Sequence, residues 1–259
     1  MMKRVLGAIV AALVVSATPS LSQPVSQAQV REGPTLILTA KVPLTGVSGR
    51  IDHFTFDSKR RLTIFSGLGN DTIEMVNNFR GKHVNTIKGL NEPQGPLYVP
   101  GLDKLFVANA GNGVVDVYDA KTWTLRKSIS LGEDSDTDNL RYDESAKQLF
   151  VGKVGGIAVI DAETEVHVGD LKGSGGHVES FQLEKNGTRV FANVPSDGSV
   201  VNVIDRKSGA LTKWELNGAK ANYPMILDEA NHRLFVVTRT PPLVVVLIPT
   251  QERKLHECV

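Results

Sequence analysis

Cysteine is nearly absent from this chain of 259 residues, in which Cys258 is the one thiol. A single thiol cannot close a disulfide within the chain, so a folded domain has to be stabilised by its apolar core. Long runs of lysine or arginine are also lacking, and 29 basic residues face 28 acidic ones. The sequence therefore gives no support for a nucleic-acid surface, which needs many phosphate-neutralising cations.

Catalytic signatures are missing as well. The sequence contains no Gly-x-Ser-x-Gly elbow, no His-Glu-x-x-His pair and no Cys-x-x-Cys pair. Two glycine-rich segments, Gly67–Gly69 and Gly173–Gly176, fall between expected strands rather than before helices, which argues against a phosphate-binding loop. We therefore predict no catalytic residues, and we leave enzymatic activity undecided with a preference for a non-enzymatic protein.

The N-terminus has the three parts of a secretory signal peptide. A basic start at Lys3 and Arg4 precedes an apolar run from Val5 to Val15 and a stretch of small residues that ends at Ser22. The apolar run is shorter than the about 20 residues of a membrane-spanning helix, although an uncleaved anchor is the alternative. We expect a signal peptide over residues 1–22, a flexible leader over residues 23–34 and no transmembrane segment after cleavage. The protein would then be periplasmic or secreted.

A repeated strand pattern dominates the rest of the chain. Five apolar triplets recur about every 40–45 residues, the length of a four-stranded propeller blade: Leu62–Ile64, Leu105–Val107, Leu149–Val151, Val190–Ala192 and Leu234–Val236. Strands rich in Val and Ile suit sheets that are covered on both faces. We predict an all-β protein, a β-propeller of four-stranded antiparallel blades over residues 35–259, with a β-sandwich as the alternative. The repeats lie near residues 49–90, 91–131, 135–171, 176–217 and 221–259.

The residues that close the third strand of each unit fit this layout. In four units the strand ends on Asn or Asp, namely Asn77, Asp119, Asp161 and Asp205. Such side chains accept hydrogen bonds from the backbone amides that follow, so we expect them to stabilise the turns.

Several segments of the chain resemble a known family. Leu105–Asn109 and Val117–Asp119 resemble the YVTN-type repeat of bacterial β-propellers, and Gly49–His53 and Asp138–Asp143 resemble its YncE-like subgroup. The resemblance implies an exported propeller without an assigned reaction. It also implies about seven repeats, within the usual four to eight blades. Because five are visible, we expect a truncated, open seven-bladed ring; the alternative is a closed five-bladed ring that uses Leu36–Leu44 as an extra strand.

Polar residues recur at one phase of the repeat, where the innermost strand of each blade should begin. Rotation about the propeller axis would bring these positions to one end of the central channel. They are His53, Gln94, Asn139, Glu179 and Asn222. Neighbours complete a predicted ligand-binding rim: Arg50, Asp52, Glu92, Asp138, Arg141 and His177.

This rim predicts a site for a small molecule or ion, because convergent polar groups on a rigid scaffold define a pocket. The alternative is that the polar groups satisfy one another between blades. Arg50 and Arg141 favour an anionic ligand, since the guanidinium fork matches carboxylate or phosphate. A divalent metal is a further possibility, although the spacing of the donors fits no zinc signature: Asp52, His53, Glu92, Asp138, His177 and Glu179.

We therefore predict an exported binding or interaction module for a small anionic molecule, an ion or a protein segment. One alternative is a metal-assisted hydrolase or lactonase-like enzyme in which His53 or Glu179 acts as a base. Another is a truncated remnant without function. The fold cannot decide among them, because propellers carry many unrelated functions.

Overall fold

The computed structural model describes residues 36–249 and 256–258. The described residues from Ala40 onward belong to one compact unit. The predicted signal peptide and leader lie outside the described residues. In the described part, every regular element is a β-strand except three one-turn 3-10 helices, which confirms the all-β prediction. None of these described helices has the length and apolar character needed to cross a bilayer.

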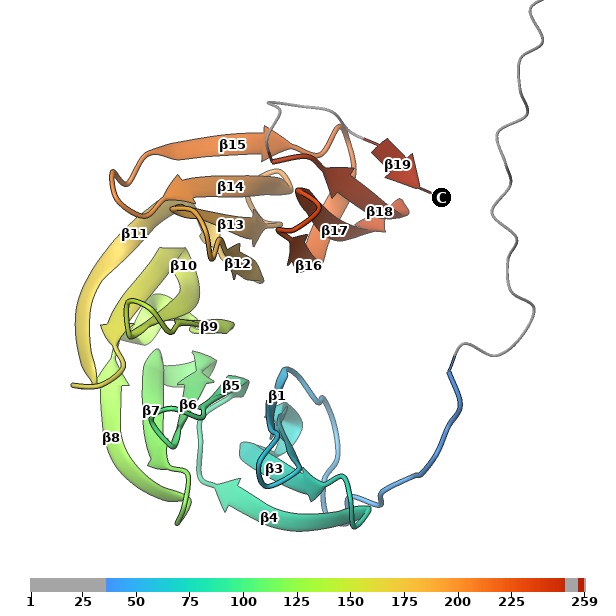
Figure 1. Ribbon diagram of the computed structural model, residues 1–259, viewed down its shortest axis with the longest axis vertical. Helices are drawn as coiled ribbons and strands as arrows, with labels where there is room; N and C mark the ends of the chain where they lie inside the picture. The colour runs from blue at the N-terminus through green and yellow to red at the C-terminus, as the bar shows by residue number, and fades with distance from the viewer. Residues whose placement is uncertain (1–35, 250–255, 259) are drawn as a thin grey trace, which may run out of the picture. The chain divides into compact units, whose positions relative to one another are not determined.

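Five blades surround a common axis, with their innermost strands nearest the centre (Figure 1). Blade 1 contains β1 (Phe54–Asp57), β2 (Leu62–Gly67), β3 (Thr72–Asn77) and β4 (Lys82–Lys88). Blade 2 contains β5 (Pro93–Val99), β6 (Lys104–Asn109), β7 (Val114–Asp119) and β8 (Thr124–Ser130). Blade 4 contains β12 (Phe181–Leu183), β13 (Arg189–Val194), β14 (Val200–Asp205) and β15 (Leu211–Glu215). Blade 5 contains β16 (Lys220–Asp228), β17 (Arg233–Thr240), β18 (Pro242–Leu247) and β19 (His256–Cys258).

Blade 3 builds the same layout from three continuous elements, β9 (Leu140–Asp143), β10 (Gln148–Asp161) and β11 (Val166–His177). The first part of β10 pairs with β9 and the second part pairs with β11, both antiparallel. The chain reverses near Gly155, whose φ of 81° favours glycine. A backbone hydrogen bond of 2.9 Å from Ala162 to Lys147 joins the two arms of β10. The propeller of four-stranded blades is thus confirmed.

The turns after the third strands form as the sequence predicts. Asp119 Oδ1 accepts hydrogen bonds from the amides of Lys121 and Thr122 at 2.8 and 3.1 Å. Asn77, Asp161 and Asp205 accept equivalent bonds from amides two or three residues later. These bonds satisfy turn amides that would otherwise need water.

The hydrophobic core lies between blades. Four clusters of buried side chains join blade 1 to blade 2, blade 2 to blade 3, blade 3 to blade 4 and blade 4 to blade 5. Phe106, for example, is fully buried in the cluster that also holds Leu149 and Val151 of blade 3. Burying a side chain of this size contributes about 1.5–3 kcal/mol. Stability therefore depends on the stacking of neighbouring blades.

Each of these four junctions also has a polar tie that involves a charged side chain. Between blades 1 and 2, Arg60 bonds Asp103 at 2.7 Å, and between blades 2 and 3, Lys104 bonds Glu165 at 2.7 Å. Between blades 3 and 4, Asp143 accepts from Arg206 at 2.6 Å. Between blades 4 and 5, Glu229 accepts from the backbone amides of Lys185 and Asn186. Because buried or half-buried charges need partners, these ties fix how neighbouring blades meet.

Blades 1 and 5 stand on either side of an opening in the ring (Figure 1). In the described ranges, none of the four apolar clusters joins these two blades. Phe56 on blade 1 and Ile226 on blade 5 accordingly have exposed fractions of 55% and 62%. The alternative of a closed five-bladed ring that uses Leu36–Leu44 as an extra strand is not supported, because these residues form no regular secondary structure. The arrangement of the described blades is an open one.

Candidate functional site

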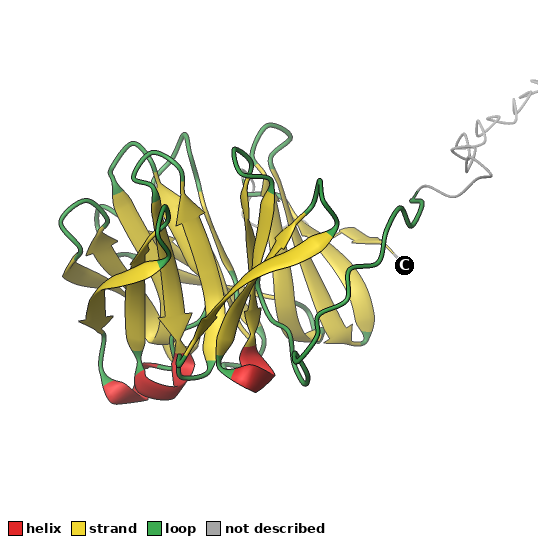
Figure 2. Ribbon diagram, turned by 90° about the horizontal axis from the view of Figure 1, so that it is seen from below, coloured by secondary structure: helices red, strands yellow, loops and turns green. Residues whose placement is uncertain are grey.

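The predicted rim lies on one side of the blades. The three 3-10 helices, η1 (Leu68–Asn70), η2 (Ala110–Asn112) and η3 (Glu133–Ser135), gather on the same side (Figure 2). Helix η3 leads directly into β9, so the innermost strands begin on that side. His53, Asn139 and Glu179 each lie one or two residues before an innermost strand, while Gln94 and Asn222 lie near the start of one.

Blades 1 and 3 meet at this rim through His53. Its Nε2 atom lies 3.1 Å from Asp138 Oδ1 and 3.1 Å from Asn139 Nδ2. The second carboxylate near the ring is Asp52, whose Oδ1 lies 3.6 Å from Nε2. Asp52 also pairs with Arg50 at 2.6 Å at the exposed edge of the rim. Residues from non-adjacent blades therefore come together, as rotation about one axis requires.

A second group forms beside Asp138. His177 ends β11, and its Nδ1 atom lies 3.4 Å from Glu179 Oε1. Its Nε2 atom lies 2.9 Å from the backbone oxygen of Asp136. One potential ligand atom from each of Asp138, His177 and Glu179 lies within 4.8 Å of the others. Three of the six predicted metal donors are thus close enough to share one ion.

The electrostatics of the rim follow from burial and from this crowding of acids. Burial raises the pKa of Asp138 above its usual range, with the two histidines acting against it. Burial disfavours the charged form of His53, but Asp138 and Asp52 outweigh it and raise the pKa of that ring. Burial likewise opposes charging of His177, yet its bond to Glu179 and the charges of Asp136 and Asp138 raise its pKa to about 9.

Arg141 lies deeper, between blades 3 and 4. It follows Leu140 in β9, and its guanidinium carbon stands 5.5 Å from the centre of the Phe181 ring. Its Nη1 atom donates to the Leu140 carbonyl at 2.7 Å and to the Asn139 side-chain oxygen. Burial lowers the pKa of Arg141 below its usual range, and the charge of Asp138 only partly opposes this. No carboxylate of the described chain pairs with it.

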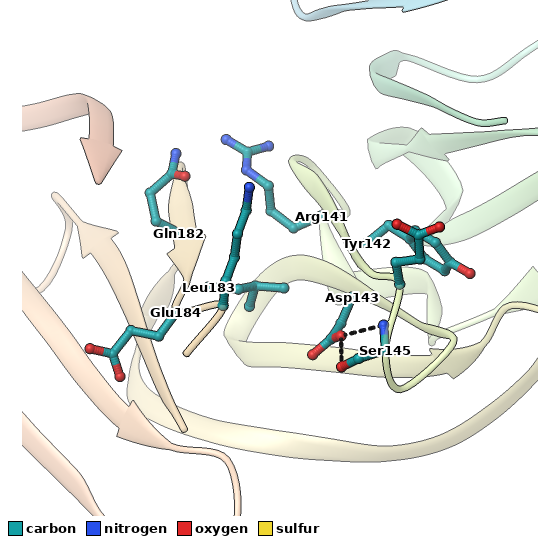
Figure 3. Close-up of a pocket in the computed structure, with 9 residues that line it drawn as sticks. Arg141, Tyr142, Asp143, Ser145, Gln182, Leu183 and Glu184 are labelled. Atoms are coloured by element: carbon teal, nitrogen blue, oxygen red, sulfur yellow. Dashed lines mark hydrogen bonds between the residues drawn. The ribbon is translucent and has the colours of Figure 1, made fainter. Parts of the chain in front are cut away.

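Two cavities open onto Arg141. The larger, of about 470 Å³, lies between β9 and β12, and in Figure 3 Arg141 and Gln182 stand along its upper part. It is lined by Arg141, Tyr142, Asp143, Glu144, Ser145, Gln182, Leu183, Glu184 and Lys185. The smaller, of about 220 Å³, is lined by His53 and Asn139 among others, together with Arg141. The volume of the larger cavity lies in the range of small-molecule sites.

Two of the three acids that line the larger cavity, Asp143 and Glu184, are already engaged. Asp143 pairs with Arg206 at 2.6 Å and accepts from Ser145, as the dashed lines in Figure 3 show for Ser145. Glu184 pairs with Arg189 through both carboxylate oxygens. The cavity therefore presents Arg141 as a cation whose charge is not cancelled by these carboxylates.

Three predicted rim residues lie apart from this cluster. Asn222 is fully buried and donates to Asn193 Oδ1 and the Val200 carbonyl at 2.9 and 3.0 Å, which ties blade 5 to blade 4. Glu92 lies in the turn between blades 1 and 2, and its backbone amide donates to the side chain of Asp71 in blade 1. Gln94 is half-buried in β5, and its side chain has no hydrogen bond to the described residues. For Asn222, the alternative that polar groups of the rim satisfy one another between blades fits the contacts better than ligand binding does.

Sequence reasoning missed three residues that face the candidate site: Asp136, Gln182 and Lys185. Asp136 belongs to the acidic segment Glu133–Asp138, a visible signal because it precedes the innermost strand of blade 3. Gln182 and Lys185 lie in or just after β12, and their role depends on how closely β9 and β12 approach. The repeat pattern does not encode that distance.

Comparison with known proteins adds information on the fold alone. No protein-family model and no curated protein matches the chain. Among solved structures, the chain is similar to hydrazine synthase of Kuenenia stuttgartiensis, with a TM-score of 0.69 and 16% sequence identity. The match covers 79% of this chain and 64% of that one, so the chain spans less than two thirds of the solved structure. The protein is a β-propeller, a fold that carries many unrelated functions.

Proposed function

We propose that this protein is an exported β-propeller of the YVTN type that binds a small anionic molecule beside Arg141. The proposal of export rests on the signal-like start of the chain, and the proposed kinship rests on the repeat strings quoted above. The binding role rests on one observation: a largely buried guanidinium lines two cavities without a carboxylate partner in the described chain.

A guanidinium in this position costs free energy unless a counter-charge joins it. The hydrogen bonds to Leu140 and Asn139 use Nη1, which leaves the other guanidinium nitrogens for a ligand. The planar fork of arginine matches the two oxygens of a carboxylate or phosphate. The shared chemistry of the ligand is therefore a carboxylate or phosphate group on a molecule that fits about 470 Å³.

Calorimetric titration of the purified protein with inorganic phosphate, acetate, citrate and a sugar phosphate tests this function. We expect saturable binding of at least one of them and a loss of at least tenfold in affinity for Arg141→Gln. Arg141→Lys retains charge but loses the fork, so it should bind with intermediate affinity. The phosphate and carboxylate arms identify which oxyanion the site prefers.

Arg80→Gln is the matched control, because Arg80 lies in an exposed turn of blade 1 away from both cavities. It should bind as the unmodified protein does. Equal affinities of the unmodified protein and Arg141→Gln, with unchanged melting, would contradict the proposal. A failure of every anion to bind would contradict it as well.

A further inference from the structure

We propose that Asp138, His177 and Glu179 form a binding site for one divalent transition-metal ion. The three side chains come from the turn before β9, the end of β11 and the segment before β12. Their donor atoms lie within 4.8 Å of one another, a spacing that one central ion can bridge. This site goes beyond the anion pocket and does not depend on it.

The first support is the burial and the incomplete hydrogen bonding of the Asp138 carboxylate. Its side chain is only 3% exposed, and its Oδ1 atom has no hydrogen-bond partner in the described residues. His53 Nε2 lies at ion-pair distance from this oxygen, 3.1 Å, without the geometry of a hydrogen bond. A buried carboxylate oxygen is costly unless its lone pairs are satisfied, and a bound cation would add a partner beside His53.

The second support is the orientation of His177. Its Nε2 atom lies 2.9 Å from the backbone oxygen of Asp136, and because a carbonyl only accepts, Nε2 carries a hydrogen there. Metal-binding histidines usually fix their second nitrogen in this way. Nδ1, the other ring nitrogen, faces Glu179 Oε1 at 3.4 Å and is the atom that would bind the metal ion.

The third support is access and donor chemistry. The side chains of His177 and Glu179 are 17% and 30% exposed, so an ion can enter from the rim and keep water ligands. One imidazole with two carboxylates suits Mn²⁺, Fe²⁺ or Zn²⁺ better than Ca²⁺ or Mg²⁺, which prefer oxygen donors alone.

Calorimetric titration of the chelator-treated protein with Zn²⁺ and Mn²⁺, and in parallel with Ca²⁺ and Mg²⁺, tests the site. We expect one Zn²⁺ or Mn²⁺ per chain and weaker binding of the alkaline-earth ions. Glu179→Gln and His177→Gln should each lower the affinity at least tenfold while the melting temperature of the metal-free protein changes little. Elemental analysis after dialysis provides a second readout of stoichiometry.

His167→Gln and Glu215→Gln are the matched controls, since each removes the same kind of donor at a position outside the cluster: His167 lies near the start of β11, ten residues before His177, and Glu215 ends β15. They should bind metal as the unmodified protein does. The proposal is overturned if no metal binds saturably, or if both cluster variants bind as tightly as the controls. Tighter binding of Ca²⁺ than of Zn²⁺ and Mn²⁺ would overturn the assignment to a transition metal.

Discussion

Gly95 in β5 lies directly against the backbone of Asp138: a β-carbon on Gly95 would stand 2.4 Å from the Asp138 carbonyl oxygen. Only a residue without a side chain allows blades 2 and 3 to approach this closely at the rim. The position of Asp138, and with it the proposed metal site, therefore depends on a glycine in the neighbouring blade.

The first prediction follows from this contact. Gly95→Ala should lower the free energy of unfolding by about 1–3 kcal/mol, the usual cost of overpacking. It should also weaken Zn²⁺ binding, because the turn that carries Asp138 must move. Chemical denaturation and metal titration measure the two effects. Gly101→Ala is the control, since a β-carbon there meets no atom within 4 Å; equal stability of the two variants would contradict the prediction.

A second prediction compares two phenylalanines. Phe106 is fully buried between blades 2 and 3, whereas Phe56 on blade 1 is 55% exposed. Phe106→Ala should cost about 3–5 kcal/mol because it leaves a cavity in a blade junction. Phe56→Ala should change stability by about 0.5 kcal/mol or less. Urea denaturation of both variants tests whether the core lies between blades; similar costs would argue that it does not.

A third prediction concerns pH and the ion pair of Lys104 and Glu165. Burial opposes ionisation of Glu165, but Lys104 and Arg126 outweigh it, so its pKa in the folded protein lies below the ordinary 4.5. A carboxyl group whose pKa is lower in the folded than in the unfolded protein stabilises the fold at pH values above its unfolded-state pKa. This contribution is lost as the pH falls through the folded-state pKa. Glu165→Gln should therefore cost about 1.5–3 kcal/mol at pH 7.

The stability cost of Glu165→Gln should shrink as the pH falls from about 5 toward 3. In this range Glu165 of the unmodified protein becomes protonated, and it is then as uncharged as the glutamine of the variant. Melting curves of both proteins across this range provide the measurement. Glu163→Gln is a suitable control, because the Glu163 backbone oxygen, not its carboxylate, accepts the bond from Lys104. A stability gap that does not change with pH would exclude this pair as its cause.

A fourth prediction separates structural from functional rim residues. Asn222→Ala removes the bonds from its amide to Asn193 and Val200, so it should cost about 1–3 kcal/mol. It should leave anion binding at Arg141 unchanged, since Asn222 lines neither cavity there. Melting and calorimetry of one preparation give both values. Loss of anion binding without loss of stability would show that Asn222 belongs to the ligand site.

Much of the fold could be predicted because the repeat is encoded locally. The apolar triplets mark the same strand in every blade, and the strand-ending Asn and Asp residues form their turn bonds within one blade, as Asp119 does. The candidate site was harder to predict, since the phase of the repeat places His53 and Asn222 at the same level of the propeller. The sequence does not reveal that His53 reaches Asn139 while Asn222 is buried against Asn193. Those distances depend on how the blades pack around the axis.

The polar contacts at the blade junctions differ from one junction to the next, so each repeat matches only its own neighbours. The cation comes from the earlier blade where Arg60 and Lys104 act, but from the later blade where Arg206 meets Asp143. A repeat that packed against the wrong neighbour would bring charges of the same sign together or leave one charge without a partner. Sequences with such similar strands could otherwise assemble in several orders, and these mismatches disfavour the wrong ones during folding.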